Sequence, residues 1–222
     1  MSSRGWVGLL LGLLAGLVLL GCDDLDVTND GVRGSGNLIT ESRSVSGFDE
    51  IVLLGSGDVV IDVTGTESLT IEAEDNIMPL LTADLSGSRL ELGSDEPFSA
   101  TRGITYTITA ATLDGVTING SGNFLASGVD TGRFEVTVNG SGDVEPNGTC
   151  AEVDVNINGS GNFRGEGLVA SVGDIGISGS GSAVVNVSDD LNVRISGSGS
   201  VEYLGNPVVD SQTTGSGSVS QR

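Results

Sequence analysis

A glycine-serine-glycine triplet recurs along this chain at a nearly constant spacing, and this repeat restricts the possible folds more than any other feature. The triplets begin at Gly34, Gly55, Gly120, Gly140, Gly159, Gly179, Gly197 and Gly215. The last six are separated by 20, 19, 20, 18 and 18 residues. A flexible linker would not keep this period, whereas a fixed period near 20 residues is typical of repeat architectures.

Hydrophobic residues keep fixed positions relative to each triplet. They stand four and two residues before its first glycine and four residues after it. These positions hold Val116, Val136, Val155, Ile175 and Val193, then Ile118, Val138, Ile157, Ile177 and Ile195, then Phe124, Val144, Phe163, Ala183, Val201 and Val219. Polar or small residues lie between them, which is the period of a strand with one buried face. A second glycine, eight residues after the triplet in most repeats, marks a second corner.

A repeat that returns to the same phase stacks strand on strand, about 4.8 Å apart. The sequence therefore predicts an all-β fold, a parallel β-helix with rungs of about 18–20 residues. The handedness of parallel crossovers favours a right-handed coil. Residues 34–222 are expected to form a single β-helical domain, with regular rungs over 116–222 and less regular, wider rungs over 34–115. The segment "DNIMPLL" breaks the strand pattern and is expected to form one helical turn.

The N-terminus carries an export signal. Arg4 precedes an apolar run over 6–20, which is short for a membrane-spanning helix of roughly 20 residues but fits a secretory signal. The run ends in "LLGC", which resembles a bacterial lipobox and implies cleavage after Gly21 and acylation of Cys22. We thus expect a signal peptide over 1–21, a lipidated cysteine with an acidic tether over 22–33, and an exported lipoprotein held on the membrane of the cell envelope. An ordinary signal peptide or a single anchor helix is the alternative.

Composition excludes several classes of function. The chain has 30 acidic residues and 9 basic residues, all arginine, for a net charge of −21. This charge argues against nucleic acid as a partner, because phosphate binding needs clustered basic residues. Without histidine or lysine there is no imidazole catalysis, no imidazole metal site and no Schiff base. Cys150 would be the one unmodified cysteine, and we expect it to be a small buried or half-buried residue.

One column of carboxylates is a candidate metal site. Glu135, Asp154 and Asp174, followed by Asn192, stand five residues before successive triplets, and their parity places them outward. Like charges in adjacent strands repel, so the column needs solvation and salt screening, or a cation. Oxygen ligands suit calcium, and weak calcium binding along Glu135, Asp154 and Asp174 is the hypothesis. No catalytic residue and no other cofactor is expected.

Three segments also carry a family resemblance. They are "VSGFDEIVLLGSGDVVI" at 45–61, "EAEDNIMPLL" at 72–81 and "ITAATLDGVTINGSGNF" at 108–124. Together they resemble the GIN domain, also called the "putative auto-transporter adhesin head domain". The resemblance implies a β-helical domain on exported, often lipid-anchored bacterial proteins, and it provides no catalytic residues.

These observations predict a non-enzymatic, lipid-anchored envelope protein that is adhesin-like or a scaffold, with the membrane and an envelope glycan or protein as partners. The alternative is a β-helical protein that binds or cleaves polysaccharide, which for cleavage needs two carboxylates facing each other in a lateral cleft. Ice or mineral binding by flat threonine and serine columns is a third reading.

The first prediction concerns the anchor. Cys22→Ala should release the mature protein from the membrane fraction into the soluble fraction, because acyl chains contribute about 0.8 kcal/mol per buried methylene. Cell fractionation and the intact mass of the membrane-extracted parent measure this. A parent protein without acyl mass would exclude the lipid anchor.

Overall fold

The computed structural model describes residues 31–222, which form an all-β solenoid of about five turns with essentially no helix. The predicted β-helical fold is therefore confirmed, while its hand stays a prediction. The strands, in chain order, are β1 (Val32–Arg33), β2 (Leu38–Arg43), β3 (Glu50–Gly55), β4 (Asp58–Val63), β5 (Ser68–Glu74), β6 (Leu81–Ser86), β7 (Arg89–Ser94), β8 (Phe98–Ser99), β9 (Thr105–Ala110), β10 (Gly115–Gly120), β11 (Asn123–Gly140), β12 (Asp143–Gly159), β13 (Asn162–Gly179), β14 (Ser182–Gly197), β15 (Ser200–Leu204), β16 (Val208–Gly215) and β17 (Ser218–Gln221).

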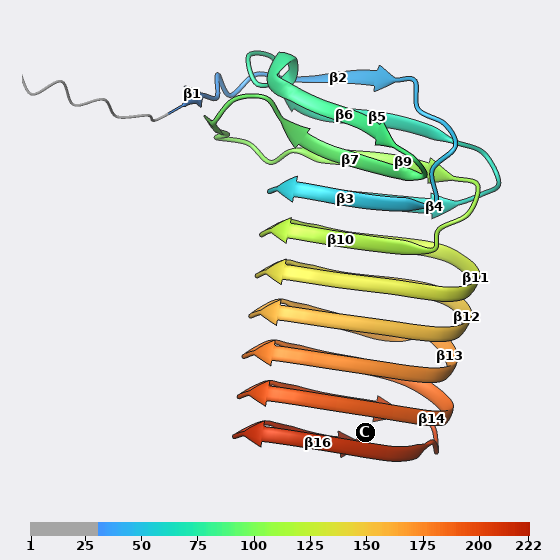
Figure 1. Ribbon diagram of the computed structural model, residues 1–222. Helices are drawn as coiled ribbons and strands as arrows, with labels where there is room; N and C mark the ends of the chain where they lie inside the picture. Colours follow the sequence, from blue (N-terminus) through green and yellow to red (C-terminus); the bar gives the residue numbers. More distant parts are fainter. Residues whose placement is uncertain (1–30) are drawn as a thin grey trace, which may run out of the picture.

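From Gly55 onward, each triplet separates two stacks of strand segments (Figure 1). The upstream stack contains the segments that end at a triplet: β3, β10, the second parts of β11 to β14, and β16. The downstream stack contains the segments that follow a triplet: β4, the first parts of β11 to β14, β15 and β17. All these neighbours are parallel, and residues in the same position of successive repeats face each other, as Val116 faces Val136.

The core is the interior between the two stacks. The predicted hydrophobic positions are buried from Val116 to Val201, and Val219 in the last rung is half-buried. Phe124, Phe134 and Phe163 are among the largest fully buried side chains. Because every rung contributes aliphatic or aromatic groups at the same positions, the core is continuous along the axis and each rung covers the next.

The triplets form tight corners where the backbones of adjacent rungs touch. The amide of Ser160 donates to the carbonyl oxygen of Gly140 at 2.9 Å. Gly159 has a φ of 144°, and a Cβ placed there would lie 2.2 Å from the same Gly140 oxygen. A Cβ at Gly161 would lie 2.3 Å from the Gly142 oxygen. Only glycine fits both positions, which explains why the triplet recurs.

The prediction of wider rungs over 34–115 is wrong for part of that segment. β3 and β4 form a rung parallel to β10 and β11, and β7 and β9 stack on them in parallel. However, β2 and β6 pair antiparallel with β5 and β7, and β5 pairs antiparallel with β9. These strands cover the N-terminal end of the solenoid (Figure 1). Alternating hydrophobicity is the same in parallel and antiparallel strands, so the sequence did not distinguish them.

The first triplet is not a corner of the solenoid. Glu74, which is 1% exposed, accepts the Thr101 amide at 2.8 Å and the Gly36 amide at 2.5 Å. The pKa of Glu74 lies below its ordinary value, mainly because the Thr101 hydroxyl donates a hydrogen bond to the carboxylate. A Cβ at Gly34 would overlap the Glu74 carboxylate. This triplet therefore closes around a buried carboxylate and ties two loops together at the covered end.

Two further expectations concern short segments. The expected helical turn is present as the 3-10 helix η1 (Met78–Leu80). The expected acidic tether over 22–33 includes Val32–Arg33, which form β1 and pair in parallel with β8, whereas residues 22–30 lie outside the described part of the chain. Cys22 and the signal peptide lie outside the described residues, so both stay predictions. No helix within residues 31–222 is long and apolar enough to cross a membrane.

The corner geometry leads to a stability prediction. Gly159→Val and Gly161→Val should each lower the free energy of unfolding by about 3 kcal/mol or more, because the new side chain would overlap the neighbouring rung. At Gly159 the positive φ would also strain the backbone of any other residue. Ser160→Ala, the control at an exposed position, should change it by less than about 0.5 kcal/mol. Urea unfolding measures all three, and equal stabilities would refute the corner assignment.

Candidate functional site

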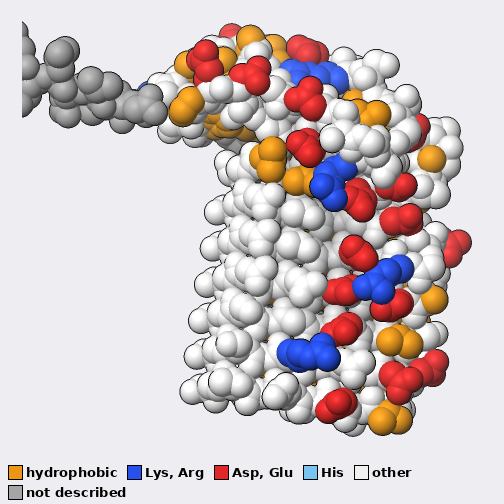
Figure 2. All heavy atoms as spheres, viewed as in Figure 1, with side chains coloured by type: hydrophobic (Ala, Val, Ile, Leu, Met, Phe, Trp, Pro, Cys, Tyr) orange, Lys and Arg blue, Asp and Glu red, His pale blue; other side chains and the backbone are white. Residues whose placement is uncertain are grey.

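The outward side chains of the upstream stack divide into two strips (Figure 2). Charged side chains gather over the first parts of the strand segments. Side chains without charge cover the last parts, next to the triplet corners, with Arg194 as the exception. Both strips are candidate sites, and strand parity alone brings their residues to one face.

The charged strip contains the predicted carboxylate column. Glu135 faces Asp154, Asp154 faces Asp174, and Asp174 faces Asn192 in the parallel register. The stacking was correctly predicted.

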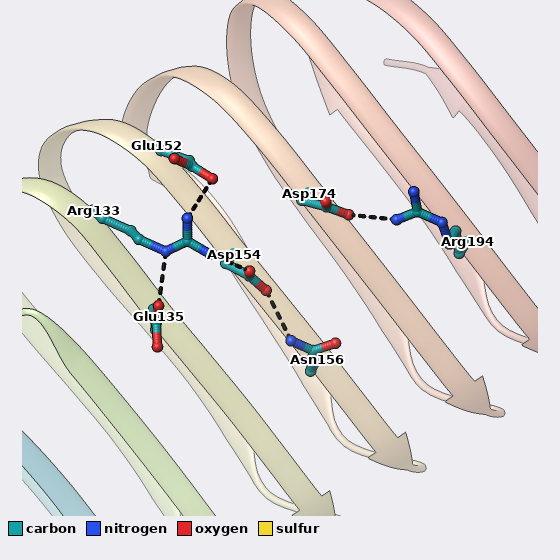
Figure 3. Close-up of polar contacts among 7 residues, drawn as sticks. All are labelled: Arg133, Glu135, Glu152, Asp154, Asn156, Asp174 and Arg194. Carbon is teal, nitrogen blue, oxygen red and sulfur yellow. Dashed lines mark hydrogen bonds and ion pairs between the residues drawn. The ribbon is translucent and has the colours of Figure 1, made fainter.

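Arg133 neutralises much of this column (Figure 3). Its Nε atom lies 2.7 Å from Glu135 Oε1, its Nη1 atom 2.7 Å from Glu152 Oε1, and its Nη2 atom 2.7 Å from Asp154 Oδ2. One guanidinium therefore joins carboxylates from two rungs. Sequence reasoning missed this contact because Arg133 stands in the next outward column; a search two residues along the strand would have found it.

Two further contacts occupy the column. Arg194 Nη1 lies 3.0 Å from Asp174 Oδ1 (Figure 3). Asn156 Nδ2 donates to Asp154 Oδ1 at 2.8 Å. Desolvation raises the pKa of Asp154, and the charges of Asp174, Glu135 and Glu152 act in the same direction against the opposing effect of Arg133.

The calcium hypothesis gains no support from this geometry. Within residues 31–222, no group of three or more histidine, cysteine, aspartate or glutamate residues is arranged to hold a metal ion. Calcium would have to compete with Arg133 and Arg194 for Glu135, Asp154 and Asp174. Ion pairing relieves the repulsion that motivated the hypothesis, and calcium binding stays a prediction to be tested.

The uncharged strip, which we call the amide–hydroxyl surface, contains two outward columns. It consists of Thr117, Asn119, Thr137, Asn139, Asn156, Asn158, Ser178, Ser196, Gln212 and Thr214. Three of its asparagines form a ladder: Asn139 Nδ2 donates to Asn119 Oδ1 at 2.8 Å, and Asn158 Nδ2 donates to Asn139 Oδ1 at 2.9 Å. These bonds hold exposed amides in fixed orientations across three rungs.

A cavity of about 880 Å³ lies over the downstream stack. It is lined by aliphatic groups such as Leu125 and by charged groups that include Glu166 and Arg222. Arg222 Nη1 lies 2.7 Å from Glu166 Oε1, and the other lining arginine, Arg164, has its Nη2 atom 2.6 Å from Asp143 Oδ2. Both arginines are thus engaged in ion pairs across rungs.

Cys150 is buried, as predicted. Desolvation, aided by the charge of Glu152, raises the pKa of its thiol to about 11. The thiolate is the nucleophilic form, so burial and the raised pKa disfavour a nucleophilic role for Cys150.

Comparisons with known proteins agree with this architecture. The model of a family described as "Putative auto-transporter adhesin, head GIN domain" matches residues 47–207. A crystal structure from Bacteroides fragilis, described as a putative adhesin, is 24% identical, covers 86% of this chain and 100% of its own, and has a TM-score of 0.72. A structure from Parabacteroides distasonis, described as a "Putative lipid binding protein", is 20% identical, covers 86% and 99%, and has a TM-score of 0.57. These two likenesses show the fold. No curated protein matches the chain.

The column leads to a prediction about charge. Arg133→Gln should lower the melting temperature by a few degrees at low salt, because Glu135, Glu152 and Asp154 lose their shared cation. Added salt should reduce this difference by screening the exposed carboxylates. Calcium should stabilise Arg133→Gln more than the parent, because the released carboxylates become available to the ion.

Arg164→Gln is the matched control, since it removes the same charge but releases only Asp143. Thermal melts at two salt concentrations, with calcium or with magnesium, measure all three proteins. Equal melting of the two variants would contradict the role of Arg133. Equal stabilisation of parent and Arg133→Gln by calcium would show that the ion binds without displacing the arginine.

Proposed function

Because the chain belongs to the family of the head GIN domain, we propose that it is a non-enzymatic, lipid-anchored protein of the bacterial cell envelope whose amide–hydroxyl surface binds a glycan. Membership of this family supports the adhesin-like β-helix in this proposal. The lipid anchor rests on the "LLGC" sequence and Cys22.

The amide–hydroxyl surface is the observation that supports the binding role. The protein carries a net charge of −21, yet the residues of this surface are amides and hydroxyls, and the exposed Leu54 borders it beside Asn119. Most of its rungs place an amide or a hydroxyl about 4.8 Å from that of the next rung. An extended, uncharged and hydroxyl-rich polymer that lies along the solenoid axis would meet donors and acceptors on successive rungs. Repeat proteins commonly use such extended surfaces for binding.

The non-enzymatic role is supported by the chemistry of the side chains. The chain has no histidine and no lysine, and the described cysteine is buried with a raised thiol pKa. Asp154 and Asp174 of the charged strip are joined to arginines, and so is Glu166 at the downstream cavity. Cleavage of a glycoside instead needs one carboxylic acid and one carboxylate on either side of the scissile bond.

The test uses the full-length protein in detergent on an array of neutral and acidic glycans. Asn139→Asp introduces a charge and disturbs the amide ladder, so it should weaken binding about tenfold or more, the equivalent of 1.4 kcal/mol. Leu125→Asp, the matched control, places the same charge in the downstream cavity and should bind as the parent does.

Three results would contradict the proposal. One is a parent protein that binds no glycan. Another is a loss of binding in Leu125→Asp but not in Asn139→Asp, which would move the site to the downstream cavity. The third is the appearance of shorter glycans after incubation, measured by mass spectrometry, which would indicate an enzyme.

A further inference from the structure

Gly176 lies in the middle of a strand segment where the fold does not require glycine. It faces Asn156 in one neighbouring rung and Arg194 in the other, and the register runs through it without a shift. It is not among the glycines with positive φ. Glycine inside a strand weakens it and marks a bulge, a tight bend, or the close approach of a ligand or another backbone. A continuous register and the absence of a positive φ argue against a bulge or a tight bend at Gly176, so close approach is the role that we pursue.

The missing side chain leaves a depression of about 280 Å³ in the upstream face. Its lining includes amides, hydroxyls and one guanidinium, from Asn156, Asn158, Ser178, Arg194, Gln212 and Thr214, together with the buried residues Ile177 and Ile195. The depression interrupts the amide–hydroxyl surface at the end of the asparagine ladder, because Ser178 follows Asn158 in that column. Its volume is near the lower end of ligand sites, which suits one small ring.

The amides at this depression have their acceptor atoms available. Asn156 donates its Nδ2 to Asp154, and Asn158 donates its Nδ2 to Asn139. In the part of the chain that the structure describes, no hydrogen bond reaches either Oδ1 atom. A Cβ placed on Gly176 would lie 2.9 Å from Asn156 Oδ1. That oxygen therefore stands over the glycine, where a ligand hydroxyl could donate to it.

The charge at the depression is already balanced. Arg194 uses Nη1 in its ion pair with Asp174, and its remaining nitrogens are donors in a pair of zero net charge. The lining includes no carboxylate and no aromatic side chain. These features disfavour a metal ion, a phosphate and an aromatic group. They suit a neutral ring whose hydroxyls both donate and accept.

We propose that the depression over Gly176 is a subsite for one neutral hexose residue of a glycan. This inference rests on the proposed function and specifies where its ligand is held most closely. Ligand hydroxyls donate to the amide oxygens of Asn156 and Asn158 and accept from Arg194, while the ring occupies the space that a side chain at 176 would fill.

Gly176→Val in the full-length protein is the direct test. Thr107→Val is the matched control, because it places valine at an exposed strand position of β9, outside the amide–hydroxyl surface. Saturation-transfer NMR with D-glucose, D-galactose, D-mannose and N-acetyl-D-glucosamine measures binding, and thermal melts measure folding. The parent and Thr107→Val should show transfer to at least one sugar, and Gly176→Val should show none.

The melting temperature separates a ligand role from a structural one. The atom that a side chain at 176 would meet is the end of the flexible Asn156 side chain, and valine favours strands. Gly176→Val should therefore melt no lower than the parent. Asn156→Ala, which keeps the cavity and removes one acceptor, should also lose most of the transfer, and it tests the proposal even where the valine variant folds poorly.

Each other outcome overturns the subsite. Undiminished transfer in a folded Gly176→Val or in Asn156→Ala places the sugar elsewhere. If the parent binds array glycans in an Asn139-dependent manner but shows no transfer to these four sugars, the subsite is wrong and the proposed function stands. If the parent binds no glycan in either assay, both fail.

Discussion

Contact between backbones at the glycine corners is the constraint on which the rest of the solenoid depends. A serine amide in each triplet donates to the first glycine carbonyl of the rung before it, at 2.9–3.0 Å from Ser141 to Ser216. A Cβ on the following rung's first glycine would lie 2.1–2.3 Å from that same oxygen from Gly140 to Gly215. The ladder of hydrogen bonds therefore continues around the corner only because no side chain is present. This contact fixes the phase of each rung, so every other position becomes a column.

Columns place identical side chains in direct contact, which helps some residue types and harms others. Aliphatic groups gain burial, and asparagines gain hydrogen bonds to each other, as Asn139 does with both neighbours. Carboxylates repel, and Asp154 illustrates the cost, because burial and neighbouring charges raise its pKa. Arginines placed one column away, such as Arg133, relieve the repulsion without leaving the surface. The charged strip of the upstream face shows this arrangement.

The N-terminal end follows different rules from the repeats. Unpaired strand edges invite association with other chains, and here antiparallel strands and a buried carboxylate cover the first rungs. β3 and β4 precede β7 and β9 in the chain but lie between them and β10 and β11 in space. In chain order, the second rung (β3 and β4) therefore comes before the end rung (β7 and β9), and the third rung (β10 and β11) follows on the other side of the second.

Periodicity was enough to predict the coil, its rungs, the buried positions and the alignment of Glu135, Asp154 and Asp174, because a parallel repeat converts spacing along the chain directly into neighbourhood in space. It was not enough for three other features. Strand direction at 34–115 depends on long-range pairing that alternation does not encode. The ion pairs of Arg133 depend on side-chain reach between columns. The depression at Gly176 exists because its neighbours in both adjacent rungs carry side chains and it does not, and only the stacked structure brings those three positions together.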